Sequence, residues 1–371
     1  MNLLFVVRTL TMGGMESSTV KLANDYASRG HEVKILTLAD RPLFYRLDGR
    51  VEHVLGEYFE PGGPKKKQVI QWIFDRRRRL LHLRSQFAAI APDAIISCWG
   101  DTNVVCIAAA RRLRIPVIVT ERAIAANAVA QPYSWLRRFF YPKAARVVVF
   151  HASMLNQFSQ RIRSKSVVIP SFVELPEEHV DTSGSIQVRP SGFRLIAMGR
   201  LAEEKRFADS IRAFATIADE FPDWTFTIYG DGNLRNRLQE QIVELSLQDR
   251  IKMPGTTRQP FDEFKKSDAF VLTSMYEGFP NVLCEALASG CPAISYNCPC
   301  GPDVILRDGV DGILVENNDF DGLVAAMRRM MGDSSFREAC ASRAPEILQR
   351  YSRKKVMGQW DELLAGVIRN R

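Results

Sequence analysis

Short apolar runs alternate with longer amphipathic stretches along the chain, and this alternation predicts buried strands separated by helices. The strand at residues 3–7, the glycine turn at 13–14, a helix that ends near Arg29 and the strand at 31–38 follow one another as a βαβ unit. Such a unit predicts a parallel, doubly wound sheet. Further elements of the first half are strands at residues 92–99, 116–120 and 147–150 and a helix at 102–113.

A second α/β alternation follows residues 176–192, whose Pro, Glu, Ser, Gly and Asp content is typical of an interdomain connection or an exposed loop near one. Its predicted strands are 193–198, 225–229, 251–253, 269–273 and 293–296, and its predicted helices are 207–220, 233–245, 280–288, 320–331 and 334–350. We therefore expect an α/β protein of two doubly wound, Rossmann-like domains, 1–175 and 176–352. A terminal helix at 353–371 is expected to pack back on the first domain.

The composition, 46% apolar and 25% charged, is ordinary for a soluble globular protein. No apolar run approaches the roughly 20 residues that span a bilayer, and the first residues are interpreted as a strand, not a signal peptide. The seven cysteines lack metal-ligand spacing, so reduced thiols in a cytoplasm are expected. Residues 1–175 hold 26 of the 50 Lys and Arg but only 13 of the 42 Asp and Glu, which predicts an anionic partner for the first domain.

The stretch at residues 274–290 holds the most specific chemistry. A helix is expected to start at Pro280, because proline is tolerated in a first turn. Glu277 then lies in the loop before the helix and Glu285 in its second turn. The first backbone N–H groups of a helix have no partner inside it and can bind a phosphate; they belong to Asn281, Val282 and Leu283. A solvated loop glutamate and an exposed helix glutamate are the alternative interpretation.

Glycines and polar residues also follow the strands of the first half. The pair Gly13 and Gly14 lets the backbone approach a ligand closely, although a plain tight turn would explain it as well. Open α/β sheets bind ligands at the carboxyl ends of their strands, so polar residues there are expected to face a binding cleft. These residues are Glu16, Asp101, Thr102, Asn103, Glu121 and Arg122.

Two stretches combine basic with apolar or aromatic residues. A helix over 65–84 would carry an apolar stripe and two basic blocks, and residues 135–143 mix basic and aromatic side chains. Such combinations suit an anionic membrane surface or a lipid-linked diphosphate. The alternative is a core-packed helix with a solvated basic face. The basic residues concerned are Lys65, Lys66, Lys67, Arg76, Arg77, Arg78, Arg79, Arg137 and Arg138.

Several motifs, taken in chain order, resemble those of the GT4 family of retaining glycosyltransferases. They are the glycine pair at 13–14, Met-Gly-Arg-Leu to Glu-Lys at 198–205, Tyr-Gly-Asp-Gly at 229–232, the glutamate pair with Gly278, Phe279 and Pro280, and Cys-Gly-Pro at 300–302. The resemblance covers essentially the whole chain. It implies the GT-B fold, in which an acceptor-side N-terminal domain and a nucleotide-sugar-binding C-terminal domain face each other across a deep cleft.

The resemblance also implies the roles of individual residues. Arg200 and Lys205 are the cations that bind the donor diphosphate, and their chemistry suits this role. Glu277 is the contact to the sugar, and these three residues are the catalytic candidates. Glu285 is the contact to the ribose. The remaining donor contacts are Gly14, Gly230, Thr257, Arg258, Gly278, Phe279, Pro280, Asn281, Val282 and Leu283.

Residues 101–108 and 135–142 look like the bacterial transferases that add N-acetylgalactosamine to undecaprenyl-diphosphate glycans. The basic helix at 65–84 matches the acceptor-side helix of that subgroup. The chain departs from the subgroup at Arg122, where such enzymes often carry a histidine that contacts the transferred sugar. Here a guanidinium would bind phosphate or an acceptor hydroxyl instead.

The resemblance therefore implies transfer of a sugar, with N-acetylgalactosamine the best candidate, from a UDP-sugar to a polyprenyl-diphosphate-linked oligosaccharide. No metal or other cofactor is expected, because the cationic pair can replace a metal. The enzyme is expected to be cytoplasmic and peripheral on the inner face of the plasma membrane, with no nucleic-acid partner. The alternatives are a UDP-sugar epimerase of GT-B architecture and a nucleic-acid binder, which would leave the C-terminal motifs unexplained.

Overall fold

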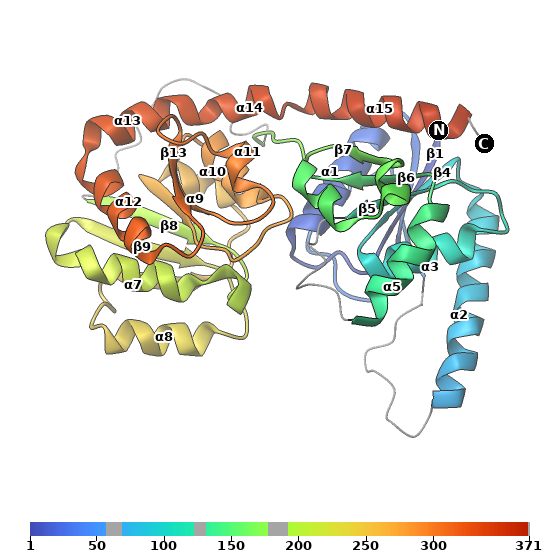
Figure 1. The fold of residues 1–371 in the computed structure, drawn as a ribbon, viewed down its shortest axis with the longest axis horizontal. Helices are drawn as coiled ribbons and strands as arrows, with labels where there is room; N and C mark the ends of the chain where they lie inside the picture. Colours follow the sequence, from blue (N-terminus) through green and yellow to red (C-terminus); the bar gives the residue numbers. More distant parts are fainter. Residues whose placement is uncertain (57–68, 122–130, 177–191, 370–371) are drawn as a thin grey trace. The chain divides into compact units, whose positions relative to one another are not determined.

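The computed structural model describes residues 1–56, 69–121, 131–176 and 192–369, and only the backbone of residues 69–76 and 131–134 (Figure 1). Nearly all of the connection predicted at 176–192 lies outside these residues, as do Lys65, Lys66, Lys67 and Arg122. The chain divides into two compact units. Unit 1 consists of Met1–Pro170 with Val356–Arg371, and unit 2 of Ser171–Lys355.

Unit 1 contains, within the described residues, a seven-stranded parallel sheet of order β3-β2-β1-β4-β5-β6-β7. Its strands are β1 (Asn2–Val7), β2 (Glu32–Thr37), β3 (Val51–Leu55), β4 (Ala94–Cys98), β5 (Val117–Glu121), β6 (Arg146–Val149) and β7 (Ser166–Val168). The five strands expected in this half are confirmed. The two edge strands were not predicted. In β3, Glu52 and His53 are exposed and interrupt the apolar run that signals a buried strand, and β7 is only 3 residues long.

The helices of unit 1 are α1 (Gly14–Ser28), α2 (Val69–Ile90), α3 (Gly100–Ala110), α5 (Gln131–Phe140), α6 (Gln160–Arg163) and most of α15 (Arg353–Arg369). Short 3-10 helices are η1 (Tyr141–Lys143) and η2 (Ala152–Gln157). Helix α15 is fastened to α1, because the carboxylate of Asp361 accepts a hydrogen bond from the Tyr26 hydroxyl at 3.1 Å and pairs with Arg29 at 2.7 Å.

Unit 2 contains, in the part of the chain described, a six-stranded parallel sheet of order β10-β9-β8-β11-β12-β13. Its strands are β8 (Phe193–Met198), β9 (Trp224–Tyr229), β10 (Ile251–Gly255), β11 (Ala269–Leu272), β12 (Ala293–Asn297) and β13 (Gly312–Glu316). The five strands expected here are confirmed, and β13 was not predicted.

The helices of unit 2 are α7 (Phe207–Ile217), α8 (Arg235–Glu244), α9 (Pro260–Lys265), α10 (Asn281–Ala288), α11 (Pro302–Ile305), α12 (Phe320–Gly332), α13 (Ser334–Arg343) and α14 (Ile347–Arg350). Its 3-10 helices are η4 (Glu203–Lys205), η5 (Ala218–Glu220) and η6 (Ala344–Glu346). The single helix predicted at 334–350 is divided into α13, η6 and α14, because Pro345 has no N–H to continue the helical hydrogen bonds.

Each sheet reverses its strand order once, between β1 and β4 in unit 1 and between β8 and β11 in unit 2. This confirms two doubly wound units. Ligands of such sheets bind outside the carboxyl ends of the strands at the reversal. An ion pair spans each of these points, Arg8–Asp101 in unit 1 and Lys205–Glu277 in unit 2.

Candidate active site

The loops that follow β8 and β11 meet at Lys205 and Glu277. The Lys205 ammonium lies 2.6 Å from Oε1 of Glu277, and the two side chains are only 21% and 10% exposed. The hydroxyl of Ser274 donates to the same oxygen at 2.7 Å. Two donors therefore hold one oxygen of the Glu277 carboxylate, which fixes its orientation at the reversal point of the sheet.

Hydrogen bonds to backbone carbonyls also tie these two loops together. The hydroxyl of Thr273 donates to the Lys205 carbonyl at 3.0 Å, and the Met275 N–H donates to the Glu204 carbonyl at 2.8 Å. Thr273 and Ser274 directly follow β11 and were not predicted as site residues. Their position at the carboxyl end of a strand was the signal that could have found them.

Arg200 lies in the same loop as Lys205, but its side chain is 69% exposed. Its guanidinium pairs with the carboxylate of Glu204 at 2.6 Å. Burial by itself raises the pKa of Glu204, but hydrogen bonds from its own backbone N–H and from Arg200 bring that pKa below its ordinary value. Both cations predicted to bind the diphosphate therefore already have a carboxylate partner, with which a bound diphosphate would compete.

Helix α10 starts at Asn281, one residue after the predicted start at Pro280, which is its N-cap residue at φ −74° and ψ 83°. This bend lets the Asn281 N–H donate back to the Phe279 carbonyl at 2.9 Å, and the Leu283 N–H donates to the Pro280 carbonyl at 3.0 Å. The expectation of three free amides is therefore wrong for Asn281 and Leu283, because the turn around proline uses both. Glu285 is half-buried in the second turn of the helix.

Glycines let the backbones of neighbouring loops approach each other at two places. Gly230, after β9, has φ +144°, and a Cβ there would lie 1.8 Å from the Gly199 carbonyl oxygen. Gly301, after β12, has φ +141°, and a Cβ there would lie 2.6 Å from Cδ of Pro280. Any other residue at these positions would clash with the neighbouring loop and would be strained at the left-handed φ. The glycines of both motifs therefore allow close packing of the loops around the candidate site.

The loop after β10 carries Thr257 and Arg258, the predicted contacts to the base. Its start is held beside the loop after β9, since the Gly230 N–H donates to the Gly255 carbonyl at 2.7 Å. The Thr257 hydroxyl accepts from the Gln259 N–H at 3.0 Å, and the Arg258 side chain is exposed. The roles of Thr257 and Arg258 stay predictions.

In unit 1 the glycine loop is clamped by an aromatic hydroxyl. The Tyr45 hydroxyl donates to the Gly13 carbonyl at 2.7 Å and accepts from the Gly13 N–H at 2.9 Å. A Cβ on Gly13 would lie 2.2 Å from Oε2 of Glu16, so the Glu16 carboxylate covers this backbone. Gly14 begins α1 directly after the clamp.

Other residues expected to face the cleft from unit 1 are buried instead. Asn103 and Glu121 are 0% and 1% exposed, and the Tyr141 hydroxyl joins them by accepting from Asn103 at 2.9 Å and donating to Glu121 at 2.7 Å. Arg137 is 5% exposed and lies 3.6 Å from the Glu121 carboxylate. The prediction that Arg137 contacts a membrane is therefore wrong, because its guanidinium neutralises a buried carboxylate. Thr102 is likewise fully buried. Among the described residues of this set, Glu16 and Asp101 are partly exposed, and Asp101 pairs with Arg8 at 3.4 Å.

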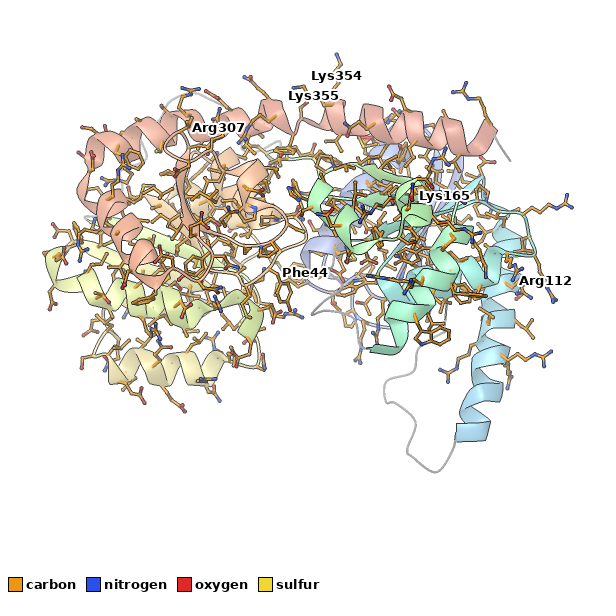
Figure 2. All side chains as sticks on the ribbon, viewed as in Figure 1. Phe44, Arg112, Lys165, Arg307, Lys354 and Lys355 are labelled. Atoms are coloured by element: carbon orange, nitrogen blue, oxygen red, sulfur yellow. The ribbon has the colours of Figure 1, made fainter. Side chains whose placement is uncertain are left out.

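Exposed aromatic and basic side chains gather on one region of unit 1. On α5, Trp135 and Phe139 are 61% and 58% exposed, and Lys143 lies 3.4 Å above the Phe139 ring. Helix α3 packs against both α5 and α2, and Arg112, just past its end, extends outward beside α2 (Figure 2). The exposed residues among the predicted basic set are Arg77, Arg78 and Arg138; Arg79 is half-buried, and Arg76 lies outside the described side chains.

Among the side chains that the structure describes, no group of three or more His, Cys, Asp or Glu could hold a metal ion. The triplet Asp319-Phe320-Asp321 opens α12, where the Asp319 carboxylate caps the helix by accepting from the Gly322 N–H at 2.9 Å. No helix in the described part of the chain is long and apolar enough to cross a membrane.

Two family profiles match the chain. The family described as Glycosyl transferases group 1 matches residues 184–347, and the Glycosyl transferase 4-like domain matches residues 13–171.

The chain is 25% identical over 368 residues to the GalNAc-alpha-(1->4)-GalNAc-alpha-(1->3)-diNAcBac-PP-undecaprenol alpha-1,4-N-acetyl-D-galactosaminyltransferase of Campylobacter jejuni, with 99% of each chain covered. It is 33% identical over 192 residues to an exopolysaccharide phosphotransferase of Streptomyces coelicolor. That match covers 49% of this chain and only 20% of the relative's length.

Solved structures share the fold. The structure of Anabaena HepE in complex with UDP and glucose has a TM-score of 0.78 and 20% identity, and covers 99% of this chain and 100% of its own. Sucrose-phosphate synthase from Thermosynechococcus elongatus has a TM-score of 0.81 and 15% identity, with 100% of each chain covered. The two sheets of this protein therefore have the architecture of known two-domain transferases.

Proposed function

Because the chain belongs to the glycosyltransferases of GT-B fold, with a glycosyl transferase 4-like domain followed by a group 1 domain, we propose that it is a retaining enzyme. It moves an N-acetylhexosamine, with N-acetylgalactosamine the best candidate, from a UDP-sugar to a polyprenyl-diphosphate-linked oligosaccharide in bacterial glycan assembly.

The observation that carries this proposal is the pair Lys205–Glu277 at the reversal point of unit 2. A nucleotide-sugar needs a cation for its phosphates beside an acceptor oxygen for a sugar hydroxyl, and this pair offers both. The similarity to the Campylobacter transferase over 99% of each chain supports the sugar and the lipid-linked acceptor. The HepE complexes with UDP and with UDP-glucose support UDP as the nucleotide.

In this proposal each residue acts on a separate part of the donor. Departing UDP develops negative charge, which Lys205 and Arg200 stabilise. The carboxylate of Glu277 accepts from a sugar hydroxyl and orients the ring, and Glu285 accepts from the ribose. The acceptor hydroxyl attacks on the face from which UDP departs, and the donor β-phosphate takes its proton, which retains the anomeric configuration.

The two cations also take the place of a metal in this proposal, since they neutralise the leaving diphosphate. Transfer is therefore expected to proceed equally well with EDTA present.

Unit 1 supplies the acceptor side in this proposal and lies on the cytoplasmic face of the plasma membrane. The exposed Trp135 and Phe139 can enter the interfacial layer, while Arg138 and Lys143 meet anionic headgroups. This arrangement would bring a lipid-linked acceptor to a protein that binds its donor from solution.

The proposal is tested by incubating the enzyme with a lipid-linked acceptor pool and one UDP-sugar at a time. Mass spectrometry should show the addition of N-acetylhexosamine from UDP-N-acetylgalactosamine, and proton NMR of the product should show an α-linkage. Conversion of a UDP-sugar to its epimer without acceptor would favour the epimerase alternative. Absence of transfer from every UDP-sugar would overturn the proposal.

A further inference from the structure

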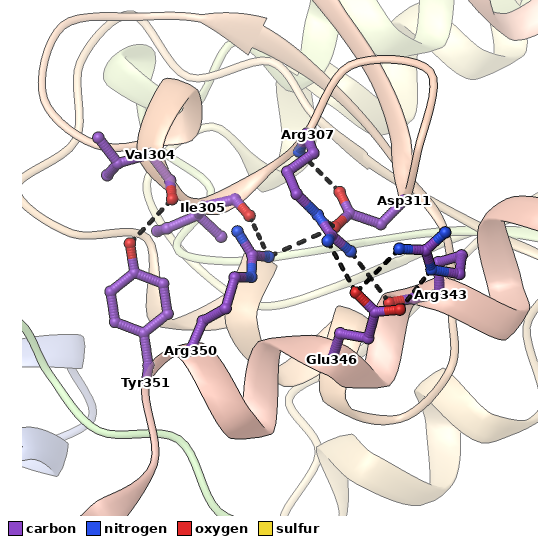
Figure 3. Close-up of polar contacts among 8 residues, drawn as sticks. All are labelled: Val304, Ile305, Arg307, Asp311, Arg343, Glu346, Arg350 and Tyr351. Carbon is purple, nitrogen blue, oxygen red and sulfur yellow. Dashed lines mark hydrogen bonds and ion pairs between the residues drawn. The ribbon is translucent and has the colours of Figure 1, made fainter. Parts of the chain in front are cut away.

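Tyr351 joins three segments of unit 2. Its ring packs edge-on against Phe279, with centroids 5.6 Å apart and an interplanar angle of 73°. Its hydroxyl donates to the Val304 carbonyl of α11 at 2.8 Å (Figure 3). Its carbonyl accepts from the Val173 N–H at 2.9 Å, near the first residues of the unit. The side chain of Tyr351 thus connects the loop before α10 with α11. The backbone carbonyl of Tyr351 connects these two segments with the start of unit 2.

The loop that Tyr351 contacts is the one that carries Glu277. Phe279 is only 6% exposed and lies between Glu277 and the first residue of α10. On its other side the same loop is held through backbone, because the Glu277 N–H donates to the Pro299 carbonyl at 3.2 Å. The ring of Tyr351 is therefore one of the supports of this loop, in addition to the contacts of Glu277 with Lys205 and Ser274.

The segment that presents Tyr351 is itself anchored by a charged network (Figure 3). The guanidinium of Arg307 pairs with the fully buried carboxylate of Asp311 at 2.7 Å and with Glu346 at 2.7 Å. Arg350 donates to the Ile305 carbonyl at 2.6 Å and to Asp311 at 3.3 Å. Because a buried carboxylate needs these partners, the network fixes residues 346–351 against the end of α11.

We propose that Tyr351 is a positioning residue for the transfer reaction, which acts through Phe279 to fix the loop of Glu277 and the start of α10 in the geometry that binds the donor. The inference rests on the proposed function, because it takes this loop to be part of the donor site. Burial raises the pKa of Tyr351 to about 12, so its hydroxyl remains a donor to Val304 at neutral pH.

The test measures UDP affinity by calorimetry and kcat and KM for the UDP-sugar in Tyr351→Ala, Tyr351→Phe and the wild type. Loss of the ring contact in Tyr351→Ala should weaken UDP binding about tenfold and raise KM in parallel. Tyr351→Phe keeps the ring and should restore affinity to within about twofold of the wild type. The matched control is Phe193→Ala. Phe193 stacks on Trp224 with ring centroids 5.2 Å apart, and it lies at the amino end of β8, whereas the candidate site lies at the carboxyl ends of the strands. This control should lose stability but keep UDP affinity.

A double-mutant cycle with Phe279→Leu isolates the proposed contact. Once Phe279 is replaced, Tyr351→Leu should cause no further loss of UDP affinity; additive losses would overturn the proposal. Tyr351→Leu also replaces the alanine variant if that variant does not fold. A wild-type protein that binds no UDP would contradict the proposed function, whereas UDP binding that is unchanged in Tyr351→Ala and Tyr351→Leu would contradict only the role of Tyr351.

Discussion

At the scale of single residues, the site keeps its charges paired before any donor arrives. Lys205 contacts Glu277 and Arg200 contacts Glu204, each at 2.6 Å. The first pair is largely buried, so removing either partner would leave an uncompensated charge in a poorly solvated place. Arg200 is mostly exposed, and its pair with Glu204 is correspondingly weaker. In the proposed donor complex, a diphosphate would therefore bind Arg200 at little cost, whereas Lys205 would share its charge between phosphate and Glu277.

Replacement of either cation should weaken donor binding. We expect Arg200→Ala and Lys205→Ala each to raise the Kd of UDP by at least about tenfold, since a charge-assisted contact to phosphate is lost. Calorimetry on the folded variants measures this, with Lys266→Ala as a control, because Lys266 is a half-exposed cation at the end of α9. UDP affinity equal to the wild type in both variants would show that the diphosphate binds elsewhere.

Ser274 should affect catalysis more than donor binding. Ser274→Ala removes one of the two hydrogen-bond donors to Oε1 of Glu277, so the orientation of the carboxylate is less restricted. We expect kcat to fall by about three- to tenfold while the Kd of UDP stays unchanged, because the lost bond is one to the charged group that we propose as the contact to the sugar. Steady-state kinetics and calorimetry separate the two effects. Ser342→Ala, which removes a hydroxyl from exposed α13, is the control. A Ser274→Ala variant with wild-type kcat would contradict the orientation of Glu277 by this hydroxyl.

At the scale of elements, α5 has two faces of opposite character. One face buries Arg137 against the rings of Tyr141 and Phe158 and beside Glu121. The other presents exposed aromatic rings to solvent. The mixture of basic and aromatic residues predicted this stretch as a membrane anchor. In the fold the exposed face carries Trp135, Phe139 and Arg138, whereas Arg137 is buried.

The exposed face of α5 should therefore be needed for binding to lipid. We expect the double variant Trp135→Ser/Phe139→Ser to reduce binding to phosphatidylglycerol-containing liposomes by at least about tenfold, because two large apolar side chains no longer enter the interface. Liposome sedimentation measures this, and UDP affinity should not change. Val243→Ser is the matched control, since Val243 is 56% exposed on α8 of unit 2. Equal sedimentation of the double variant and the wild type would contradict the lipid-facing role of α5.

At the scale of the whole molecule, arginine–carboxylate pairs join segments that are far apart in the chain. Arg29 pairs with Asp361 and thereby fastens the last helix to the first. In unit 2, Arg307 pairs with Glu346, and hydrogen bonds from Arg343 and Arg307, opposed by partial burial, lower the pKa of Glu346 to about 2. These contacts depend on ionised carboxylates, so the stability of the molecule should depend on acid pH.

We expect the contribution of Glu346 to the free energy of unfolding to be constant above pH 4.5, the ordinary value for glutamate, and to be lost as the pH drops from there toward about 2. Stability falls with falling pH because the pKa of Glu346 is lower in the folded state than in the unfolded state, so protonation of Glu346 favours unfolding. Denaturant titrations at a series of pH values measure this decline. Glu346→Gln should make it shallower, whereas Glu244→Gln, on the exposed face of α8, should not. An unchanged decline in Glu346→Gln would contradict the role of this network in acid stability.

The sequence by itself determined the elements and the class of fold. Apolar runs and glycine turns are local signals, so the buried strands and α10 could be predicted from neighbouring residues alone. The motifs also brought Lys205 and Glu277 into the predicted site. Their role as partners could not be predicted, because they are far apart in sequence and meet only where the loops after β8 and β11 lie side by side.

Only the tertiary structure decided which polar side chains are exposed and what each one contacts. Arg137 and Asn103 have the residue types of a surface or a cleft, yet both are buried. Glu121 pairs with Arg137 at 3.6 Å, and the Tyr141 hydroxyl accepts a hydrogen bond from Asn103. Tyr351 belongs to no motif, and its contact with Phe279 exists only because the end of unit 2 folds back along α10. Burial and long-range pairing are properties of the packed chain, and a pattern of neighbouring residues does not contain them.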